Sequence, residues 1–389
     1  MERSWQRSPK LSVGVQYFLY FGVMGVFLPY FNLYCYHIGF SGFQIGAISG
    51  IRTAATILFA VFWGMLADRY QIRRPLYILC NFISTGIWIG YLFTVDFGPM
   101  LLITVCYGIF YAPLIAFLEA FSMDVLGPQK TSYGTLRVWG SIGFILVVVL
   151  VGRAIDLYSS RIILGLILTG SAVLAIFSTR IPRITPVRRA AFIPQAKLLF
   201  ERPVVVFLAC AFLMLVSHGA YYGFFSIHLE NLGYGRTFIG FTWALASTAE
   251  ILVMINSHHI FRKFDIEAVL LFSFLIAAAR WLALSYLTTP TMILISQISH
   301  AVTYGTFHMA SILYIDKLTP RGAKTLGQAA NNAATYGLGM MVGFFLNGYL
   351  YEIARPFTLF AVSSAIAFSA ALIFGLDKAF RTQSRVLRP

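Results

Sequence analysis

The chain has 389 residues, of which 59% are hydrophobic and 11% are charged, and its formal net charge is +15. This apolar share exceeds the roughly one half that is usual for soluble proteins, so it predicts an integral membrane protein. The positive charge does not indicate a nucleic-acid partner, because the basic residues lie in short connections between apolar runs and no basic soluble domain is present to bind phosphates.

Twelve apolar runs follow one another, and each approaches the roughly 20 residues that a helix needs to cross a bilayer. The first run is long and has no small-residue cleavage site, so we expect a retained helix rather than a signal peptide. The runs lie near residues 11–36, 43–66, 76–94, 99–123, 135–155, 161–179, 203–228, 237–260, 267–287, 291–315, 325–350 and 356–376.

Most of the basic residues gather in alternate connections between these runs, and the other connections hold few. Because cytoplasmic loops carry an excess of lysine and arginine, this pattern predicts that both termini lie in the cytoplasm, together with the proline-rich segment 180–202. We expect the protein in the inner (plasma) membrane of a bacterium, in contact with the lipid bilayer.

The segment 180–202 separates six runs from six, which predicts one six-helix bundle in residues 1–179 and a second in residues 203–389. The halves repeat at an offset of 194 residues: IGFSGFQIGAI at 38–48 matches LGYGRTFIGFT at 232–242, and Gly25 falls on Gly219. Paired bundles of this kind are typical of secondary transporters, whose substrate site lies near the bilayer midplane.

Two charged residues lie in runs that the turn LGPQKTS joins. Glu119 and Arg137 are each nine residues from Pro128, so an antiparallel helical hairpin places them at similar depth. Charges inside a membrane usually face the bundle interior or a water-filled cavity. Glu119 and Arg137 form either a structural ion pair or a substrate site. In a substrate site, Arg137 binds an anionic or polar group of the substrate, and Glu119 is the counter-ion that orients Arg137.

Glu250 lies in the middle of an apolar run with no basic residue within a helical turn. A carboxyl group surrounded by hydrocarbon favours its neutral form, so Glu250 is a candidate proton carrier. Arg280 is its expected partner across the bundle. A permanent Glu250–Arg280 pair would be structural. A pair that forms only when substrate or proton is absent would couple substrate transport to proton transport. Arg52 has no clear partner in the sequence.

The seventh run carries a ridge of polar and aromatic side chains. His218, Tyr221, Tyr222 and Phe225 recur at the spacing of one helix face. Such a stripe is often packing, but a titratable histidine at its head favours a face that lines a cavity and contacts substrate.

Further polar residues lie on the tenth and eleventh runs. His300 and His308 are two turns apart on one face, with Tyr304 between them, so they form either a proton path or hydrogen bonds between helices. Asn331 and Asn332 are candidates for hydrogen bonds to substrate, and helix packing is the alternative for both.

No motif indicates an enzyme. The chain has no phosphate-cradling loop and no nucleophile–base set, and its four cysteines stand singly without the paired spacing of a zinc site or a disulfide framework. We therefore expect no catalytic residues, no metal and no cofactor, and any uphill transport would draw on an ion gradient.

The segment GMLADRYQIRR at 64–74 resembles the cytoplasmic signature of the major facilitator superfamily, although the usual glycine and basic residue are replaced by Gln71 and Ile72. The resemblance implies an all-α membrane protein with the major facilitator fold, twelve transmembrane helices in two six-helix pseudo-repeats. It also implies a close helix approach at Gly64 and a gating or anchoring role at the cytoplasmic face for Gly64, Asp68, Arg69 and Arg73.

Within the superfamily the chain is similar to the phenylpropionate permease group, which is related to the oligosaccharide and nucleoside proton symporters. The resemblance rests on YGTLRVWGSIGF at 133–144, HGAYYGFFSIHL at 218–229 and SHAVTYGTFHMASILYIDKL at 299–318, among other blocks. It implies a monomeric proton symporter that imports a small organic acid such as 3-phenylpropionate. Similarity to the lactose-type symporters implies that Glu119 and Arg137 contact the substrate.

Other functions stay open at this point. A proton-coupled symporter of sugars or nucleosides would use Glu119 as its main ligand, and proton-driven efflux of hydrophobic compounds is a further alternative. From a different class, a membrane receptor that transports nothing is disfavoured by the short loops and by the lack of any appended domain.

Overall fold

The computed structural model describes residues 9–127, 133–182, 199–320, 323–354 and 356–386, and these residues are almost entirely helical. They divide into two compact units. Unit 1 comprises Met1–Ala190 with Leu229–Ala244, and unit 2 comprises Ala191–His228 with Leu245–Pro389. Most of the predicted segment 180–202, and the turn around Lys130, lie outside the described residues.

Each predicted apolar run coincides with one helix or with consecutive helices. Among the described residues, nine spans are long and apolar enough to cross a membrane, and α8 is a shorter apolar helix of 17 residues. The prediction of an all-α membrane protein is confirmed.

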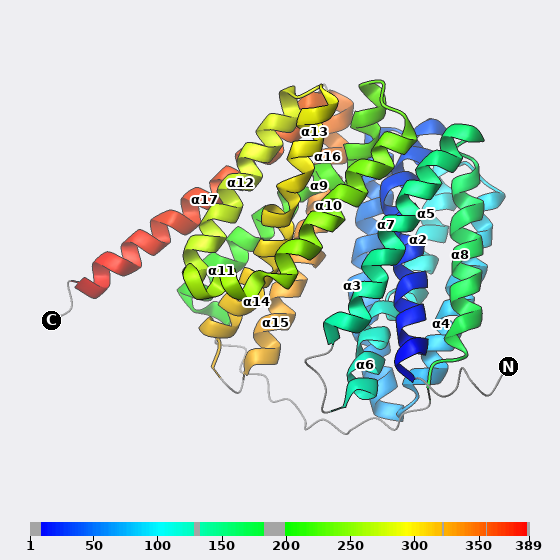
Figure 1. Cartoon of the computed structure of the whole chain (residues 1–389), viewed down its shortest axis with the longest axis horizontal. Coiled ribbons are helices and arrows are strands. Elements are labelled where there is room, and N and C mark those ends of the chain that lie inside the picture. Colours follow the sequence, from blue (N-terminus) through cyan, green and yellow to red (C-terminus); the bar gives the residue numbers. More distant parts are fainter. Residues whose placement is uncertain (1–8, 128–132, 183–198, 321–322, 355, 387–389) are drawn as a thin grey trace. The chain divides into compact units, whose positions relative to one another are not determined.

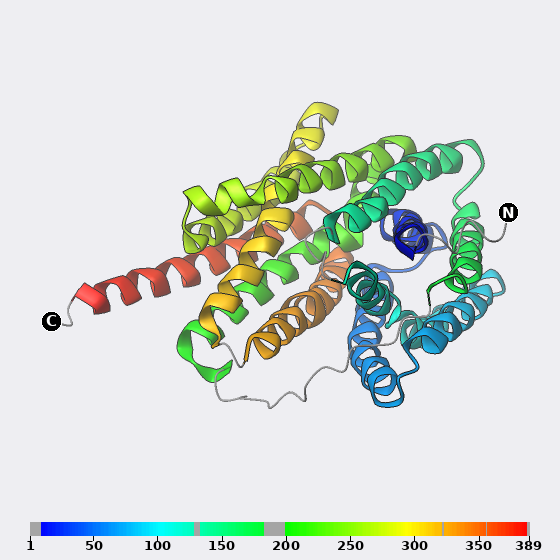
Figure 2. The same cartoon turned by 60° about the horizontal axis from the view of Figure 1, so that its bottom comes forward.

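Unit 1 is arranged around its first helix. Figure 2 shows α2 nearly end-on with other helices of the unit around it, and α2 packs against α3, α6, α7 and α8. A capping box starts α3, because Ser41 and Gln44 exchange side-chain and backbone hydrogen bonds. The elements are α2 (Pro9–His37), α3 (Gly42–Tyr70), α4 (Arg73–Trp88), η1 (Ile89–Leu92), α5 (Phe97–Tyr111), α6 (Leu114–Leu126), α7 (Tyr133–Leu157) and α8 (Ile162–Ser178).

Unit 2 contains most of the remaining helices, and α12 packs along α17 within it (Figure 1). The elements are α9 (Arg202–Asn231), α10 (Arg236–Ile255), α11 (Ser257–Lys263), α12 (Ile266–Tyr286), α13 (Pro290–Ile298), η4 (Ala301–Thr306), α14 (Phe307–Leu318), α15 (Lys324–Asn332), η6 (Ala333–Gly339), α16 (Met340–Ile353) and α17 (Pro356–Val386). The end of α9 and the start of α10 belong to unit 1.

Two helices of unit 2 contain a π-helical segment. The first, η4, lies between α13 and α14, and the second, η6, lies between α15 and α16. A π segment widens the helix locally and turns the following side chains to a new direction, and such segments are frequent at functional sites. Both segments contribute side chains to the polar cluster described below.

The internal repeat is visible in the backbone. Gly39 and Gly233 occupy equivalent positions at the offset of 194 residues, and their φ angles are +91° and +89°. A methyl group added at Gly25 would lie 2.9 Å from a carbonyl oxygen of Phe144 in α7, and one added at Gly219 would lie 2.4 Å from the backbone of Gly343 in α16. In each half, a glycine therefore permits a close crossing between corresponding helices.

The loop between α9 and α10 is anchored inside unit 1 by Asp156 of α7. Its carboxylate accepts hydrogen bonds from the backbone N–H groups of Arg236, at 2.9 Å, and Thr237, at 2.8 Å. A carboxylate at a helix N-terminus satisfies unpaired N–H groups and complements the helix dipole. The Tyr30 hydroxyl donates to carbonyl oxygens of Val148 and Arg236. These bonds explain why Leu229–Ala244 clusters with unit 1.

The signature segment joins α3 to the following helices. Arg73 Nη1 lies 2.7 Å from Asp124 Oδ2 in α6, and 3.5 Å separates its Nη2 from Asp68 Oδ1. Arg69 is exposed and stacks on the Tyr70 ring. At Gly64, an added methyl group would meet no heavy atom within 4 Å, so the expected close helix approach at Gly64 is not found in unit 1.

Candidate functional site

The core of unit 2 contains a chain of three ionisable side chains from three helical segments. Arg280 of α12 lies with Nη1 2.9 Å from Nδ1 of His300, which immediately precedes η4. On the other side of the imidazole, His300 Nε2 lies 3.9 Å from Oε2 of Glu250 in α10. Glu250 and Arg280, the expected partners, thus each contact His300.

The hydrogen bond from Arg280 assigns the tautomer of His300. A guanidinium has only donors, so Nδ1 must accept, and the neutral imidazole then carries its proton on Nε2. That N–H faces the Glu250 carboxyl group. The His300 side chain is only 5% exposed and that of Glu250 is 25% exposed. Of the two side chains, that of Glu250 is thus the more exposed.

Further contacts hold Arg280 in place. Its Nη1 lies 3.1 Å from the Thr303 hydroxyl, and its Nη2 donates to Gln297 Oε1, also at 3.1 Å. The same Gln297 oxygen accepts a hydrogen bond from the Tyr221 hydroxyl at 3.0 Å. The faces of the guanidinium lie 4.6 Å from the ring centres of both Tyr221 and Trp281. A buried cation is tolerated when it is hydrogen-bonded and stacked in this way.

His218 of α9 joins the same cluster. Its Nδ1 lies 2.8 Å from the carbonyl oxygen of Met214, so Nδ1 donates and Nε2 is left as an acceptor. This Nε2 is buried and has no hydrogen-bond partner among the described residues. The imidazole packs edge-to-face on Trp281, and Tyr222 stacks on it. The predicted ridge of α9 therefore points into the polar core of unit 2.

The second histidine of the tenth run lies at the edge of this cluster. His308 Nδ1 is 2.7 Å from the hydroxyl of Tyr336 in η6. The Tyr304 ring stacks on both His300 and His308, with ring centres 5.2 Å and 6.3 Å away, so an aromatic ring separates the two imidazoles. The two imidazoles are therefore linked through this ring and are not in direct contact with each other.

The two asparagines of the eleventh run have different surroundings. Asn331 is buried, its Nδ2 lies 3.5 Å from the Ser311 hydroxyl, and its Oδ1 accepts no hydrogen bond from any described residue. Asn332 is exposed within its unit. The structure therefore brings only Asn331 into a buried polar position.

Unit 1 holds the other predicted pair. Arg137 of α7 stacks on Phe21, with its guanidinium carbon 3.9 Å from the ring centre, and reaches the Tyr17 ring at 5.8 Å. Glu119 of α6 lies within electrostatic range of Arg137, but no ion pair of 4.0 Å or less joins them in the described part of the unit. The two groups therefore do not satisfy each other directly.

An aromatic surface lies beside this pair. The Tyr111 ring stacks on Tyr20, at 5.6 Å, and on Tyr107, at 5.0 Å. Tyr20 lies within electrostatic range of Arg137 and of a second arginine, Arg52 of α3. Two cations and Glu119 are thus arranged around one aromatic surface of unit 1.

Several members of these clusters were not predicted from the sequence. Gln297, one turn before His300, could have been found as a polar residue inside an apolar run. Tyr336 and the partners of Arg52 left no comparable signal, because tyrosine and phenylalanine are common throughout the chain. The cluster in unit 2 comprises His218, Tyr221, Tyr222, Glu250, Arg280, Trp281, Gln297, His300, Thr303, Tyr304, His308 and Tyr336.

The sequence matches a family model described as the MFS_1 like family over residues 11–362. It is 27% identical to the probable 3-phenylpropionic acid transporter of Escherichia coli (strain K12), across 86% of this chain and 89% of that protein. It is 24% identical to the maltose permease of Geobacillus stearothermophilus, across 92% of each. A crystal structure of a mutant of the nucleoside transporter NupG is similar in fold, with a TM-score of 0.86, 18% identity, and 95% and 99% of the two chains covered.

Proposed function

The chain belongs to the MFS_1-like family of the major facilitator superfamily and is thus a membrane transporter, and we propose that it imports a small aromatic acid together with protons. The proposed substrate class is that of 3-phenylpropionate, and the proposed mechanism is alternating access. The bundles that would rearrange are residues 1–179 and 203–389, with 180–202 as their cytoplasmic linker.

The observation that carries proton coupling is the contact series Glu250–His300–Arg280. Arg280 occupies Nδ1 of His300 and so holds the imidazole in its neutral form. Glu250 is then the proposed member of the series that gains and loses a proton, because its side chain is the more exposed of the two. Protonation of Glu250 removes its attraction for the His300 N–H, which changes the contacts of two helices of unit 2 at once.

The charges of unit 1 support an anionic substrate. Arg52 and Arg137 carry two positive charges near Tyr20, and Glu119 carries one negative charge. The excess of one positive charge is complemented by a monocarboxylate, and the tyrosine rings offer stacking surface to an aromatic group. The proposed substrate contacts are Glu119 and Arg137 in unit 1, and His218, Tyr221, Tyr222, His308, Asn331 and Asn332 in unit 2.

The proposed setting follows the distribution of basic residues. The protein would be a monomer in the inner membrane of a bacterium, with both termini in the cytoplasm. The segment from Gly64 to Arg73 would then lie at the cytoplasmic face, where the Arg73–Asp124 ion pair ties α4 to α6 and Asp68 and Arg69 are exposed.

The test is uptake of labelled 3-phenylpropionate by the full chain in proteoliposomes under an imposed proton gradient. Protein-free liposomes give the background, because the uncharged acid crosses bilayers unaided. We expect accumulation that a protonophore abolishes and that Glu250→Gln abolishes, while the exposed Glu201→Gln leaves it intact. Exchange of labelled for unlabelled acid needs no net proton movement, so we expect it to survive in Glu250→Gln. Accumulation that is indifferent to both the protonophore and Glu250→Gln would overturn proton coupling through Glu250.

A second candidate is a proton symporter of sugars or nucleosides, which the similarity to the maltose permease and to the NupG fold favours. The same proteoliposomes, supplied with labelled maltose and uridine, separate the two. Uptake of either neutral solute, without uptake of the acid, would keep the fold and transfer the substrate assignment to this candidate.

A further inference from the structure

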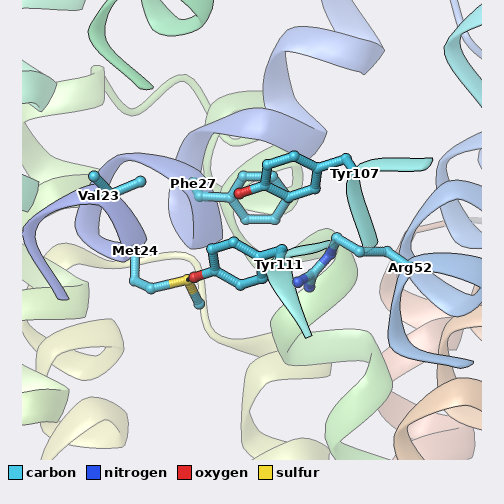
Figure 3. Close-up of a pocket in the computed structure, with 6 residues that line it drawn as sticks. All are labelled: Val23, Met24, Phe27, Arg52, Tyr107 and Tyr111. Atoms are coloured by element: carbon cyan, nitrogen blue, oxygen red, sulfur yellow. Dashed lines mark hydrogen bonds between the residues drawn. The ribbon is translucent and has the colours of Figure 1, made fainter. Parts of the chain in front are cut away.

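Arg52 lies in a hollow of unit 1 that the first, second and fourth predicted spans line together. Figure 3 shows its guanidinium turned toward the side chains of α2 and α5. The lining side chains pack closely and leave no room for a water molecule, so a ligand reaches the guanidinium edge only when these side chains move apart. The lining comprises Val23, Met24, Phe27, Arg52, Tyr107 and Tyr111.

Small residues bring these helices together. A methyl group added at Gly108 of α5 would lie 2.8 Å from Cβ of Ala55 and 3.6 Å from the backbone oxygen of Arg52. The close crossing of α3 and α5 places Tyr107, which precedes Gly108, and Tyr111, one turn later, beside the guanidinium. The close crossing of α3 and α5 thus fixes where the backbones of Arg52, Tyr107 and Tyr111 lie.

Arg52 uses one face of its guanidinium and leaves the edge free. The guanidinium carbon lies 4.6 Å from the centre of the Phe27 ring, which is a cation–π contact. Such a contact occupies the π face, whereas the N–H donors point outward in the plane of the group. No carboxylate among the described residues lies within 4.0 Å of Arg52.

The other polar groups of the hollow are also donors. The Tyr111 hydroxyl donates to the sulfur of Met24 at 3.0 Å and is therefore already occupied. The Tyr107 hydroxyl forms no hydrogen bond with any residue that the structure describes, and Tyr107 is 3% exposed. The lining thus offers the half-buried guanidinium edge and the Tyr107 hydroxyl as donors, and it contains no acidic residue.

We propose that Arg52 is the residue that selects anionic substrates, and that its guanidinium edge, assisted by the Tyr107 hydroxyl, receives the substrate carboxylate. This inference rests on the proposed function, because it assigns the carboxylate of that same substrate to a residue of the hollow. The rings of Tyr107 and Tyr111 pack beside the apolar part of the ligand. Bidentate recognition by a guanidinium fits a planar carboxylate.

Arg137 fits this role less well. Glu119 lies within electrostatic range of Arg137 and offsets its charge, whereas Arg52 has no such counter-ion. Arg137 then contacts the substrate as part of a charge-balanced pair with Glu119, and Arg52 distinguishes an acid from its neutral counterpart. The two arginines therefore differ in which property of the ligand they recognise.

The test compares two ligands that differ only in charge, 3-phenylpropionate and 3-phenylpropionamide. Binding to the full chain in detergent is measured by tryptophan fluorescence for the wild type, Arg52→Gln and Arg52→Lys. Tyr107→Phe removes only the hydroxyl that assists Arg52, so it tests the same carboxylate site if Arg52→Gln does not fold. Arg153→Gln is the matched control, because Arg153 is exposed on α7 of the same unit.

We expect Arg52→Gln to weaken binding of the acid about 10- to 100-fold, the range for loss of a charge-assisted hydrogen bond, and to leave binding of the amide within about twofold. Arg52→Lys and Tyr107→Phe should show smaller losses confined to the acid, and Arg153→Gln should show none. Equal losses for the acid and the amide would mean a structural role and overturn the inference.

Two further outcomes separate this inference from the proposed function. Acid-over-amide selectivity that survives in Arg52→Gln but is lost in Arg137→Gln would overturn the role of Arg52 and keep the organic-acid substrate. Failure of the wild type to bind any carboxylate, with binding of uridine or maltose instead, would overturn both.

Discussion

The guanidinium of Arg280 and the imidazole of His300 share a hydrogen bond of 2.9 Å inside unit 2. The bond fixes the protonated nitrogen of the imidazole and directs it toward Glu250, 3.9 Å away. The histidine is thus a spacer between a permanent cation and a carboxyl group that can change its charge. Loss of the histidine should affect both the stability of unit 2 and the coupling to protons, and the two effects are separable.

We expect His300→Phe to destabilise the fold more than His300→Gln does. Phenylalanine leaves one donor of the buried Arg280 without its nitrogen partner, which costs about 1.5–3 kcal/mol for a hydrogen bond to a charged group. Glutamine offers an acceptor at a similar reach and should recover most of this loss. Thermal unfolding in detergent, followed by fluorescence, checks the order of the two variants.

Transport by the same two variants tests the coupling role. Glutamine can accept from Arg280 and also donate, but its flexible amide does not hold the donor in the fixed position of the imidazole N–H, so we expect His300→Gln to fold but to accumulate substrate less than the wild type does. Wild-type accumulation by His300→Gln would contradict a coupling role and reduce His300 to a structural acceptor.

Neutralising Arg137 should abolish uptake without removing the folded protein from the membrane. Arg137 rests on Phe21 and has no ion pair of 4.0 Å or less with Glu119 in the described part of unit 1. Arg137→Gln therefore breaks no ion pair, although it loses the contact with Phe21, and it removes the donor proposed for a substrate group. The measurement is uptake divided by the amount of folded protein, and that amount is determined by size-exclusion chromatography. Undiminished transport by Arg137→Gln would defeat the assignment of Arg137 to the substrate site.

The helices and the repeat could be predicted from the sequence because they depend on local properties. Apolar runs of sufficient length become helices in a membrane, where every backbone group must be paired within the segment. The equivalence of Gly39 and Gly233 could be found from the repeat alone, and both glycines indeed adopt a positive φ. The residues that carry charge inside the runs were also evident, since few of them occur.

The pairing of these charges could not be predicted, because it depends on how each helix is rotated about its axis. Glu250 and Arg280 were expected to meet, yet the π segment η4 begins immediately after His300 and sets this imidazole between them. A π segment has no reliable sequence signature. The surroundings of Arg52 escaped prediction for a related reason, since its aromatic neighbours come from two other helices and resemble many other aromatic residues of the chain.

The close crossing at Gly219 predicts a large effect for a small substitution. Gly219→Ala would place Cβ 2.4 Å from the backbone of Gly343, so α9 and α16 must separate, and we expect a loss of about 1–3 kcal/mol from overpacking. The matched control is Gly165→Ala in α8, where the added methyl group would meet no heavy atom within 4 Å. Because alanine is the better helix former, the control should gain up to about 1 kcal/mol. Equal thermal stability of the two variants would contradict the crossing.

The last prediction concerns the turn at the end of α3, where the signature of the superfamily is altered. Gln71 adopts the left-handed conformation, with φ 55° and ψ 36°, and it is the only described residue other than glycine with a positive φ. Side chains with a Cβ are disfavoured there by about 1–2 kcal/mol, whereas glycine is not. Gln71→Gly should therefore raise the unfolding temperature of the protein.

A second variant isolates the cause of this gain. The Gln71 side chain donates to the backbone oxygen of Asp68 at 2.6 Å, an exposed hydrogen bond that both Gln71→Gly and Gln71→Ala remove. Gln71→Ala retains the Cβ and hence the backbone strain, so we expect it to be no more stable than the wild type. If the gain comes from relief of left-handed backbone strain, Gln71→Gly must be more stable than Gln71→Ala. Equal stability of the two variants would mean that the side-chain hydrogen bond, and not the backbone, controls this turn.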